Sequence, residues 1–284
     1  MKYAAVFILS IFLISCSSDD VDIQNATKNY LPIDVGHEWT YERVATINGE
    51  SDSGTDVTTM TGTTTIDGIS YTEWDNVNYL FGFSNSIFTN KEGDVTFFKI
   101  PDIDLGFGEA ISLEPFAMID DNSSAGTTLA SIDLEQQFAA IPIDTLGFAG
   151  TITPVIFLEA SSVHATRFDN VTLNGTDEYE DVYKNESSFF VQVDLVADLT
   201  YEGFPLQLTH TWLPMQEYAV LETWFVHDIG LARSVVEIGI SEVDSTVDIP
   251  IVGELDLEEF GIDFEDYIDV DDARLVSELI DYTL

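Results

Sequence analysis

The sequence predicts an all-β protein built on a single elaborated antiparallel sheet with hairpin connections. Long stretches alternate apolar and polar residues, most clearly over 189–199, which is the period of a half-buried strand. Asn-Gly and Asp-Gly pairs separate such stretches, and these dipeptides favour two-residue hairpin turns. Hydrophobic residues at 45% and aromatic residues at 12% supply enough apolar surface for a core, which argues against disorder despite the high charge.

The folded domain is expected to span 30–284, opening with an extended entry at Tyr30 and a first strand from Trp39. Asn48-Gly49 predicts a hairpin turn, and the polar residues 50–56 are expected to form a loop. Asp67-Gly68 predicts a second hairpin. Strands in this half are expected at 58–66, 69–74, 79–83, 86–90 and 95–100.

Residues 101–160 are expected to form an elaboration of the sheet. Pro and Gly interrupt their apolar fragments repeatedly. The segment 132–140 fits a short helix or a strand equally well, because periodicity does not separate the two in short apolar runs.

The second half carries the strongest strand patterns, with Asn174-Gly175 marking another hairpin. Strands are expected at 167–173, 179–185, 189–199, 206–212, 219–226 and 231–240. The C-terminal segment 271–284 has two readings. Its apolar residues fit one face of a helix capped by Asp271 or Asp272, which propensity slightly favours, and they also fit the alternation of a closing strand.

The N-terminus has the pattern of a secretory signal peptide. Lys2 precedes an apolar run that is shorter than the roughly 20 residues needed to span a bilayer. The run ends in Leu13-Ile14-Ser15-Cys16, which resembles the lipobox of bacterial lipoproteins. The resemblance implies removal of 1–15, cleavage between Ser15 and Cys16, and lipidation of Cys16. The alternative is an ordinary cleaved signal with an incidental cysteine.

Residues 16–29 are polar and acidic, and we expect them to form a flexible tether. Acidic residues directly after the lipidated cysteine resemble the export signal of surface-displayed lipoproteins of some Gram-negative bacteria. The resemblance implies attachment to the outer membrane, with a surface-exposed location favoured over a periplasm-facing one. The expected membrane partner is reached through the N-terminal lipid, because several acyl chains make a stable anchor.

Charge and cysteine content narrow the function further. With 52 acidic and 9 basic residues, the net charge is −43, which excludes nucleic acid as a partner because its phosphates must be met by Lys and Arg. Cys16 is the only cysteine, so the mature body has no internal disulfide, thiol-rich metal site or catalytic thiol.

Three stretches resemble a group of uncharacterised bacterial lipoproteins. The entry Tyr30-Leu31-Pro32 with Gly36, Trp39 and Tyr41 is similar to their aromatic-x-Pro-Leu-x-x-Gly-x-x-Trp-x-Tyr opening. The later stretches are Trp224 to Arg233 and Glu278-Leu-Ile-Asp-Tyr282. The resemblance implies a curved sheet or open half-barrel around an apolar cavity, a closing strand at 271–284, and no reaction.

No catalytic residue is predicted. His37, His164, His210 and His227 lack the spacing of a zinc protease, and no nucleophile elbow, phosphate loop or dinucleotide fingerprint occurs. Trp74 and Tyr79 could stack on sugars if exposed, although core packing is the default for aromatic residues.

Two acidic clusters, at 263–266 and 269–272, contain the residues that could bind calcium, namely Asp266, Asp269 and Asp271. They lack EF-hand spacing, so a solvated acidic loop without metal is favoured, and no other cofactor is expected. The sequence therefore predicts a non-catalytic, lipid-anchored envelope protein that binds an apolar or glycan ligand or has a structural role. The alternatives are a carboxylate-based hydrolase and a calcium-stabilised surface adhesin.

Overall fold

The computed structural model describes residues 28–81, 84–104, 110–173, 175, 177–250, 252–262 and 272–284. Its elements are β1 Glu38–Ile47, β2 Glu50–Ile66, β3 Ile69–Asp75, α1 Asn78–Phe81, β4 Ser86–Glu92, β5 Val95–Lys99, β6 Ile103–Asp104, β7 Ala110–Ile111, β8 Phe116–Asp120, β9 Thr127–Gln137, β10 Ile141–Thr145, β11 Phe148–Leu173, β12 Asp177–Tyr201, β13 Phe204–Val226, β14 Gly230–Ile238, β15 Thr246–Ile249, β16 Gly253–Asp256, the 3-10 helix η1 Leu257–Phe260 and β17 Ala273–Thr283.

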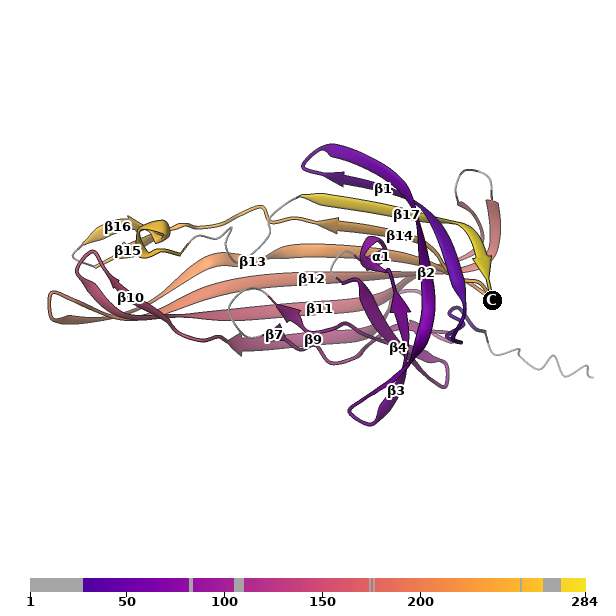
Figure 1. Ribbon diagram of the computed structural model, residues 1–284, viewed down its shortest axis with the longest axis horizontal. Coiled ribbons are helices and arrows are strands. Elements are labelled where there is room, and N and C mark those ends of the chain that lie inside the picture. Colours follow the sequence, from indigo (N-terminus) through magenta and orange to yellow (C-terminus); the bar gives the residue numbers. More distant parts are fainter. Residues whose placement is uncertain are drawn as a thin grey trace, which may run out of the picture.

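One large antiparallel sheet dominates the fold, which confirms the predicted fold class. Its strand order is β10-β11-β12-β13-β14-β17-β1-β2-β3-β4-β5-β8, and β9 pairs with β11 beside β10. The sheet curls so far that β8 lies against β9 and β11, yet no ladder joins β8 to them within the described residues. The result is an open half-barrel, with the short helix α1 inside the curl (Figure 1).

The molecule has two unequal ends, joined by the very long strands β11, β12 and β13 of 26, 25 and 23 residues. At one end, which we call the base, β1 to β5, β14 and β17 wrap around α1 (Figure 1). At the other, the lobe, the β15–β16 hairpin and η1 lie over β10 and the far parts of the long strands (Figure 1).

The base has an aromatic core. Trp39 and Trp74 stack with ring centroids 5.4 Å apart, and both are fully buried. Trp39 donates from Nε1 to the carbonyl of Ile229 at 2.7 Å, and a Cβ on Gly230 would lie only 3.1 Å from the same ring. The default expectation of core packing is confirmed for Trp74, which fills the centre of the core and is not available for sugar stacking.

The three stretches that carry the family resemblance meet in this core. Besides the contact between Trp39 and Gly230, the Tyr41 hydroxyl donates to the Leu231 carbonyl at 2.8 Å. On the outer face of the same strands, Glu278 lies 3.4 Å from Arg233, because β17 runs between β1 and β14. Residues far apart in the sequence thus form one packing unit.

The hairpin predictions at Asn48-Gly49 and Asp67-Gly68 are confirmed. All four residues have positive φ, which is the backbone geometry that the favoured two-residue turns need and that Asn, Asp and Gly tolerate. The loop expected over 50–56 is wrong, because the tight turn feeds the chain directly into β2 and Glu50 pairs with Ile47.

Two ambiguous segments are resolved as strands and one expected strand is not formed. The segment 132–140 contributes to β9, and the C-terminal segment forms β17, so the helix reading of 271–284 is wrong. Pairing with β1 and β14 on both sides outweighs the slight helix propensity. The strand expected at 79–83 is instead the single turn α1, held by hydrogen bonds from Leu80 and Phe81 to the Val77 carbonyl.

The lobe has a smaller and mainly aliphatic core. Val247, Ile249 and Leu257 are buried against the long strands, and Phe260 packs edge-on against Phe148 with centroids 5.4 Å apart. Among the described residues, no helix is long and apolar enough to cross a bilayer.

Candidate ligand-binding site

A row of polar side chains crosses the concave face of the half-barrel near α1. Strand register sets these residues directly opposite one another, and all except the partly exposed Arg43 are buried; they are His164, Asn185, Thr223, Ser234, Ser277 and Arg43. Ser234 donates from its hydroxyl to the carbonyl of Leu80 in α1. This contact identifies the face that the row occupies and fixes α1 to the inner wall.

Two rows of apolar side chains follow on the same face, one step further from α1. Residues two apart on a strand share a face, so both rows line the concave wall beside the polar row. The first row is Leu221, Val236, Leu275 and Ala45, and the second is Ala219, Ile238, Ala273 and Ile47. Exposure increases along the second row, from Ala219 at 1% to Ile47 at 45%. The wall therefore changes from a covered core to an accessible apolar surface.

Two hollows open beside these apolar rows. The hairpin hollow has a volume of about 640 Å³ and lies between the β1–β2 hairpin and Leu275. The strand-end hollow, of about 350 Å³, lies where β13 and β14 part, beside Ile238 and Ile240. Both volumes fall in the range of about 300–1,000 Å³ that small-molecule sites occupy. Between them, Asn48 and Asp272 are joined by two hydrogen bonds of 2.9 and 3.2 Å.

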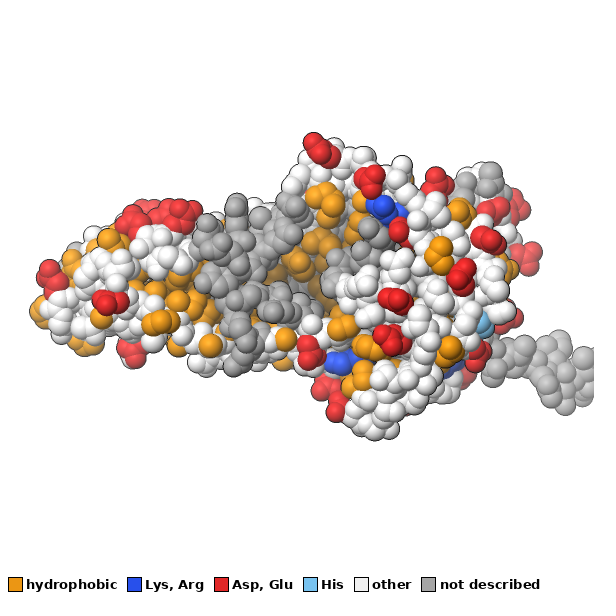
Figure 2. Space-filling model, viewed as in Figure 1, with side chains coloured by type: hydrophobic (Ala, Val, Ile, Leu, Met, Phe, Trp, Pro, Cys, Tyr) orange, Lys and Arg blue, Asp and Glu red, His pale blue; other side chains and the backbone are white. Residues whose placement is uncertain are grey.

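The space-filling view shows how these features combine. The surface is hollowed between the base and the lobe, and hydrophobic side chains are visible deep in that hollow while acidic ones are spread around it (Figure 2). The concave wall thus offers an apolar floor with a polar surround.

Charged residues at the two hollows are mostly acidic. Glu50 and Asp52 line the hairpin hollow, whereas Glu217, Glu237 and Asp272 line the strand-end hollow. Arg43 is the basic residue of the hairpin hollow, and it already pairs with Asp56 at 2.8 Å and Asp52 at 3.2 Å. Its guanidinium lies over Gly54, where a Cβ would meet Nη2 at 2.8 Å.

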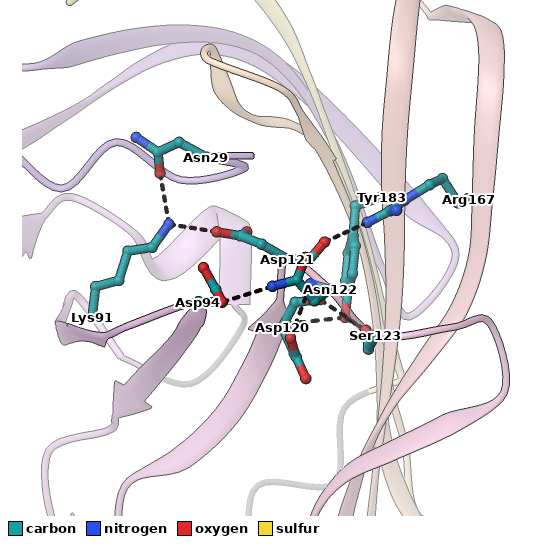
Figure 3. A network of polar contacts seen from close by, with 9 residues as sticks. All are labelled: Asn29, Lys91, Asp94, Asp120, Asp121, Asn122, Ser123, Arg167 and Tyr183. Atoms are coloured by element: carbon teal, nitrogen blue, oxygen red, sulfur yellow. Dashed lines mark hydrogen bonds and ion pairs between the residues drawn. The ribbon is translucent and has the colours of Figure 1, made fainter. Parts of the chain in front are cut away.

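A second polar cluster, which we call the tether clamp, lies in the base where the described chain begins. Lys91 bonds both the side-chain oxygen of Asn29 at 2.9 Å and the carboxylate of Asp121 at 2.7 Å (Figure 3). Arg167 donates to the Asp121 carbonyl at 2.9 Å, and Asn122 reaches Asp94 at 2.6 Å (Figure 3). Burial raises the pKa of Asp121, and the hydrogen bond from Lys91 opposes that rise.

The other half of the clamp is centred on Asp181. Its carboxylate accepts from Lys28 at 2.7 Å and from the Tyr30 hydroxyl at 2.5 Å. Burial pushes the pKa of Asp181 upward, but the bonds from Lys28 and Tyr30 outweigh it, so the pKa lies below its usual value. Arg167 lies over the Tyr30 ring at 5.1 Å. Three of the nine basic residues of the chain thus fasten its entry into the fold.

The clamp also contains a serine and a histidine in contact. The Ser123 hydroxyl lies 2.8 Å from Nδ1 of His164, which stacks on Tyr183 with ring centroids 4.0 Å apart. Burial lowers the pKa of His164, because it disfavours the charged form of the ring. Among the described residues no carboxylate orients His164, and the ring is buried, so the pair lacks the third group of a nucleophilic triad. Its evident role is to hold the turn at 121–126 against β11.

The structure separates most of the residues singled out from the sequence. Besides His164 in the clamp, His210 binds the Asp244 carbonyl at 2.8 Å in the lobe, His37 packs edge-on against Trp39, and His227 packs near Tyr30. Ser15, Cys16, Asp266, Asp269 and Asp271 lie outside the described residues. Within the described residues, no three His, Cys, Asp or Glu side chains gather as a metal site requires.

The sequence predicted neither the clamp nor the strand register that aligns the polar and apolar rows. The scarcity of basic residues was the available signal for the clamp, because each Lys or Arg in so acidic a chain is worth tracing to a partner. No family model matches the chain, and no curated protein or solved structure is significantly similar to it. The resemblance to the lipoprotein group remains a prediction.

Proposed function

We propose that this protein is a lipid-anchored, non-catalytic envelope protein that binds an apolar ligand against its concave face. The observation that carries the proposal is the pair of apolar rows that open onto the two hollows. Apolar surface left exposed in a concave, rigid wall is a standard feature of sites that remove apolar molecules from water.

An apolar ligand is favoured over a glycan by the side chains at the site. Glycan sites use exposed aromatic rings for stacking, but Trp74 is buried in the base core. The one aromatic residue that lines a hollow within the described residues is the half-buried Tyr218, and the apolar wall is otherwise made of aliphatic residues such as Ile47 and Ile238. Burying aliphatic surface stabilises a complex by about 25 cal/mol per Å² before the entropic costs of association.

The anchor part of the proposal rests on the lipobox-like sequence that ends at Cys16. Its test is a Cys16→Ser substitution followed by membrane fractionation of the producing cells. We expect the variant to leave the membrane pellet, since the acyl chains have lost their attachment point. A variant that stays in the pellet as firmly as the wild type would contradict the anchor.

The ligand part is tested by photolabelling. The full-length protein, purified in a non-ionic detergent, is irradiated with a neutral hexadecyl diazirine, and labelled peptides are mapped by mass spectrometry. We expect labels to concentrate on peptides containing Ile47, Ile238 and Ala273, and unlabelled hexadecanol to compete them away.

A matched pair of variants shows whether the hollow is responsible. Ile47→Trp fills the hairpin hollow from a residue that is 45% exposed, whereas Ile280→Trp adds the same bulk at a residue that is 49% exposed on the other face of the sheet. We expect the first to reduce the competed labelling about tenfold, equivalent to about 1.4 kcal/mol, and the second to leave it unchanged. Even labelling of both faces, without competition, would refute the proposed function.

A further inference from the structure

Resting on the proposed function, we infer that the ligand is an amphiphile with a cationic or neutral head group, and that the site rejects anionic ones such as fatty acids. The inference comes from the charges that surround the two hollows, considered together with the partners those charges already have. An apolar floor selects the tail, and the surround selects the head.

Three acidic side chains of the surround are open to solvent. Glu50, Glu217 and Asp272 are exposed, and each lines a hollow. We call these three residues the acidic rim. Glu237 also lines the strand-end hollow, but it pairs with Arg274 at 2.9 Å and contributes less.

The basic side of the surround is already neutralised. Among the described residues, Arg43 is the one cation lining the hairpin hollow, and a carboxylate head group would have to bind there. Its Nε bonds Asp56 and its Nη1 bonds Asp52, so two carboxylates already occupy it. An anionic head group that bound there would therefore lose hydrating water without gaining a cation as a partner. Removing an ion from water without such a partner is energetically costly.

The hollow geometry strengthens the charge preference. Charges of one sign around a concave, apolar surface produce a focused potential, because the low-dielectric wall screens them less than bulk water does. A cation held at the rim while its tail lies on Ile47, Ala273 and Ile238 gains this attraction without leaving water completely.

The test compares three molecules that share one tail. Hexadecyltrimethylammonium, hexadecanol and hexadecanoate compete, in the same detergent solution, with the neutral hexadecyl diazirine for the full-length protein. We expect the cation to compete best and the anion worst, with about a tenfold separation between them. The separation is expected to shrink in about 0.5 M sodium chloride, where screening shortens the reach of the rim charges.

Because the entire chain is acidic, a matched control must separate the rim from the overall charge. The rim variant is Glu50→Gln with Glu217→Gln and Asp272→Asn. The control variant removes the same charge from exposed residues of the lobe region, through Glu202→Gln, Glu254→Gln and Asp198→Asn. We expect the rim variant to lose the preference for the cation and the control to keep it.

The outcomes distinguish the inference from the function beneath it. If none of the three molecules competes, the proposed function fails. If all compete equally, or hexadecanoate competes best, ligand binding stands and the head-group inference is overturned. An equal loss of preference in the rim and control variants would also overturn it, by assigning the effect to overall charge.

Discussion

The base and the lobe cover the same long strands in different ways. In the base, stacked Trp39 and Trp74 are enclosed by the curled sheet. Trp39 donates to the Ile229 carbonyl, and Trp74 donates to the Thr89 hydroxyl at 3.0 Å. In the lobe, a two-stranded hairpin and η1 supply the covering side chains Val247, Ile249, Leu257 and Phe260. The comparison indicates that the base is the stable unit and that the lobe opens first, because local stability follows buried contacts.

The largest expected effect comes from emptying the two cores. Trp74→Ala should destabilise the whole protein by about 3–5 kcal/mol, since it leaves a cavity beneath Trp39. Phe260→Ala should instead release the lobe cover while the global unfolding midpoint in urea barely changes. Hydrogen exchange resolves the two outcomes: the amides of β15 and β16 should lose protection in the second variant alone. Loss of protection throughout β1 and β14 in Phe260→Ala would show that base and lobe unfold as one unit.

The tether clamp gives the next effect, and it lies entirely in the base. Lys91→Met leaves the buried carboxylate of Asp121 without its ion pair, a change that typically costs about 3–5 kcal/mol when one partner of a buried pair is removed. We expect a smaller cost here, about 2–3 kcal/mol, because Asp121 can take up a proton in response. Limited proteolysis near Lys28 should accelerate. Lys184→Met, at a base-region pair on the outer face, is the control and should leave that cleavage rate unchanged.

A pair of glycines compares the two ends at matched backbone geometry. Gly230 in the base and Gly203 in the lobe both have positive φ, so alanine is strained at either site by about 1–2 kcal/mol. A Cβ at Gly230 also meets Trp39 at 3.1 Å, whereas a Cβ at Gly203 meets nothing within 4 Å. Overpacking should therefore add about 1–3 kcal/mol for Gly230→Ala alone. Equal unfolding free energies for the two variants, measured in urea, would show that the Trp39 ring can move aside at no energetic cost.

The smallest effect is a pH dependence from His164. Its pKa lies below the usual value of about 6.5, because burial and then Arg167 disfavour the charged ring. Below about pH 6.5, His164 therefore binds more protons in the unfolded chain than in the folded protein. The stability of the fold that depends on His164 is fully present above about pH 6.5 and is lost as the pH falls. The slope is at most about 1.4 kcal/mol per pH unit. Urea unfolding of wild type and His164→Phe between about pH 7.5 and 5.5 should give a steeper decline for the wild type.

The sequence predicted the parts of the fold that depend on local chemistry. The turns at Asn48 and Asp67 could be predicted because Asn-Gly and Asp-Gly pairs tolerate the positive φ that these turns need. The core-facing positions of Trp39 and Tyr41 could be predicted from the alternation of apolar and polar residues along β1. The short helix α1 was missed because a run of aromatic residues has strand propensity. The helical turn depends instead on a tertiary contact with the inner wall, where the Ser234 hydroxyl donates to the Leu80 carbonyl. The strand at residues 50–56 was missed because its residues are polar on both faces and do not show the alternation of apolar and polar residues that predicts a strand.

The candidate site could not be predicted from the sequence because it depends on register between distant strands. Ile238, Ala273 and Ile47 become one row only when β14, β17 and β1 pair in their observed alignment. A shift of one residue in β17 would turn Ala273 away and bring Arg274 to the concave face, so the row is a property of pairing and not of any one segment.

The clamp holds β12 close to one end of a very long strand, because Asp181 lies near the start of Asp177–Tyr201. Its 25 residues extend roughly 80 Å, and the turn beyond it carries Phe204, which is 67% exposed. The part of β12 between Asp181 and that turn is about 66 Å long, so a change of about 10° in the strand's direction at the clamp would displace the turn by about 12 Å. The bonds of Lys28 and Tyr30 to Asp181 therefore act at the short end of a long lever, and a small change in their geometry corresponds to a large displacement at the opposite end.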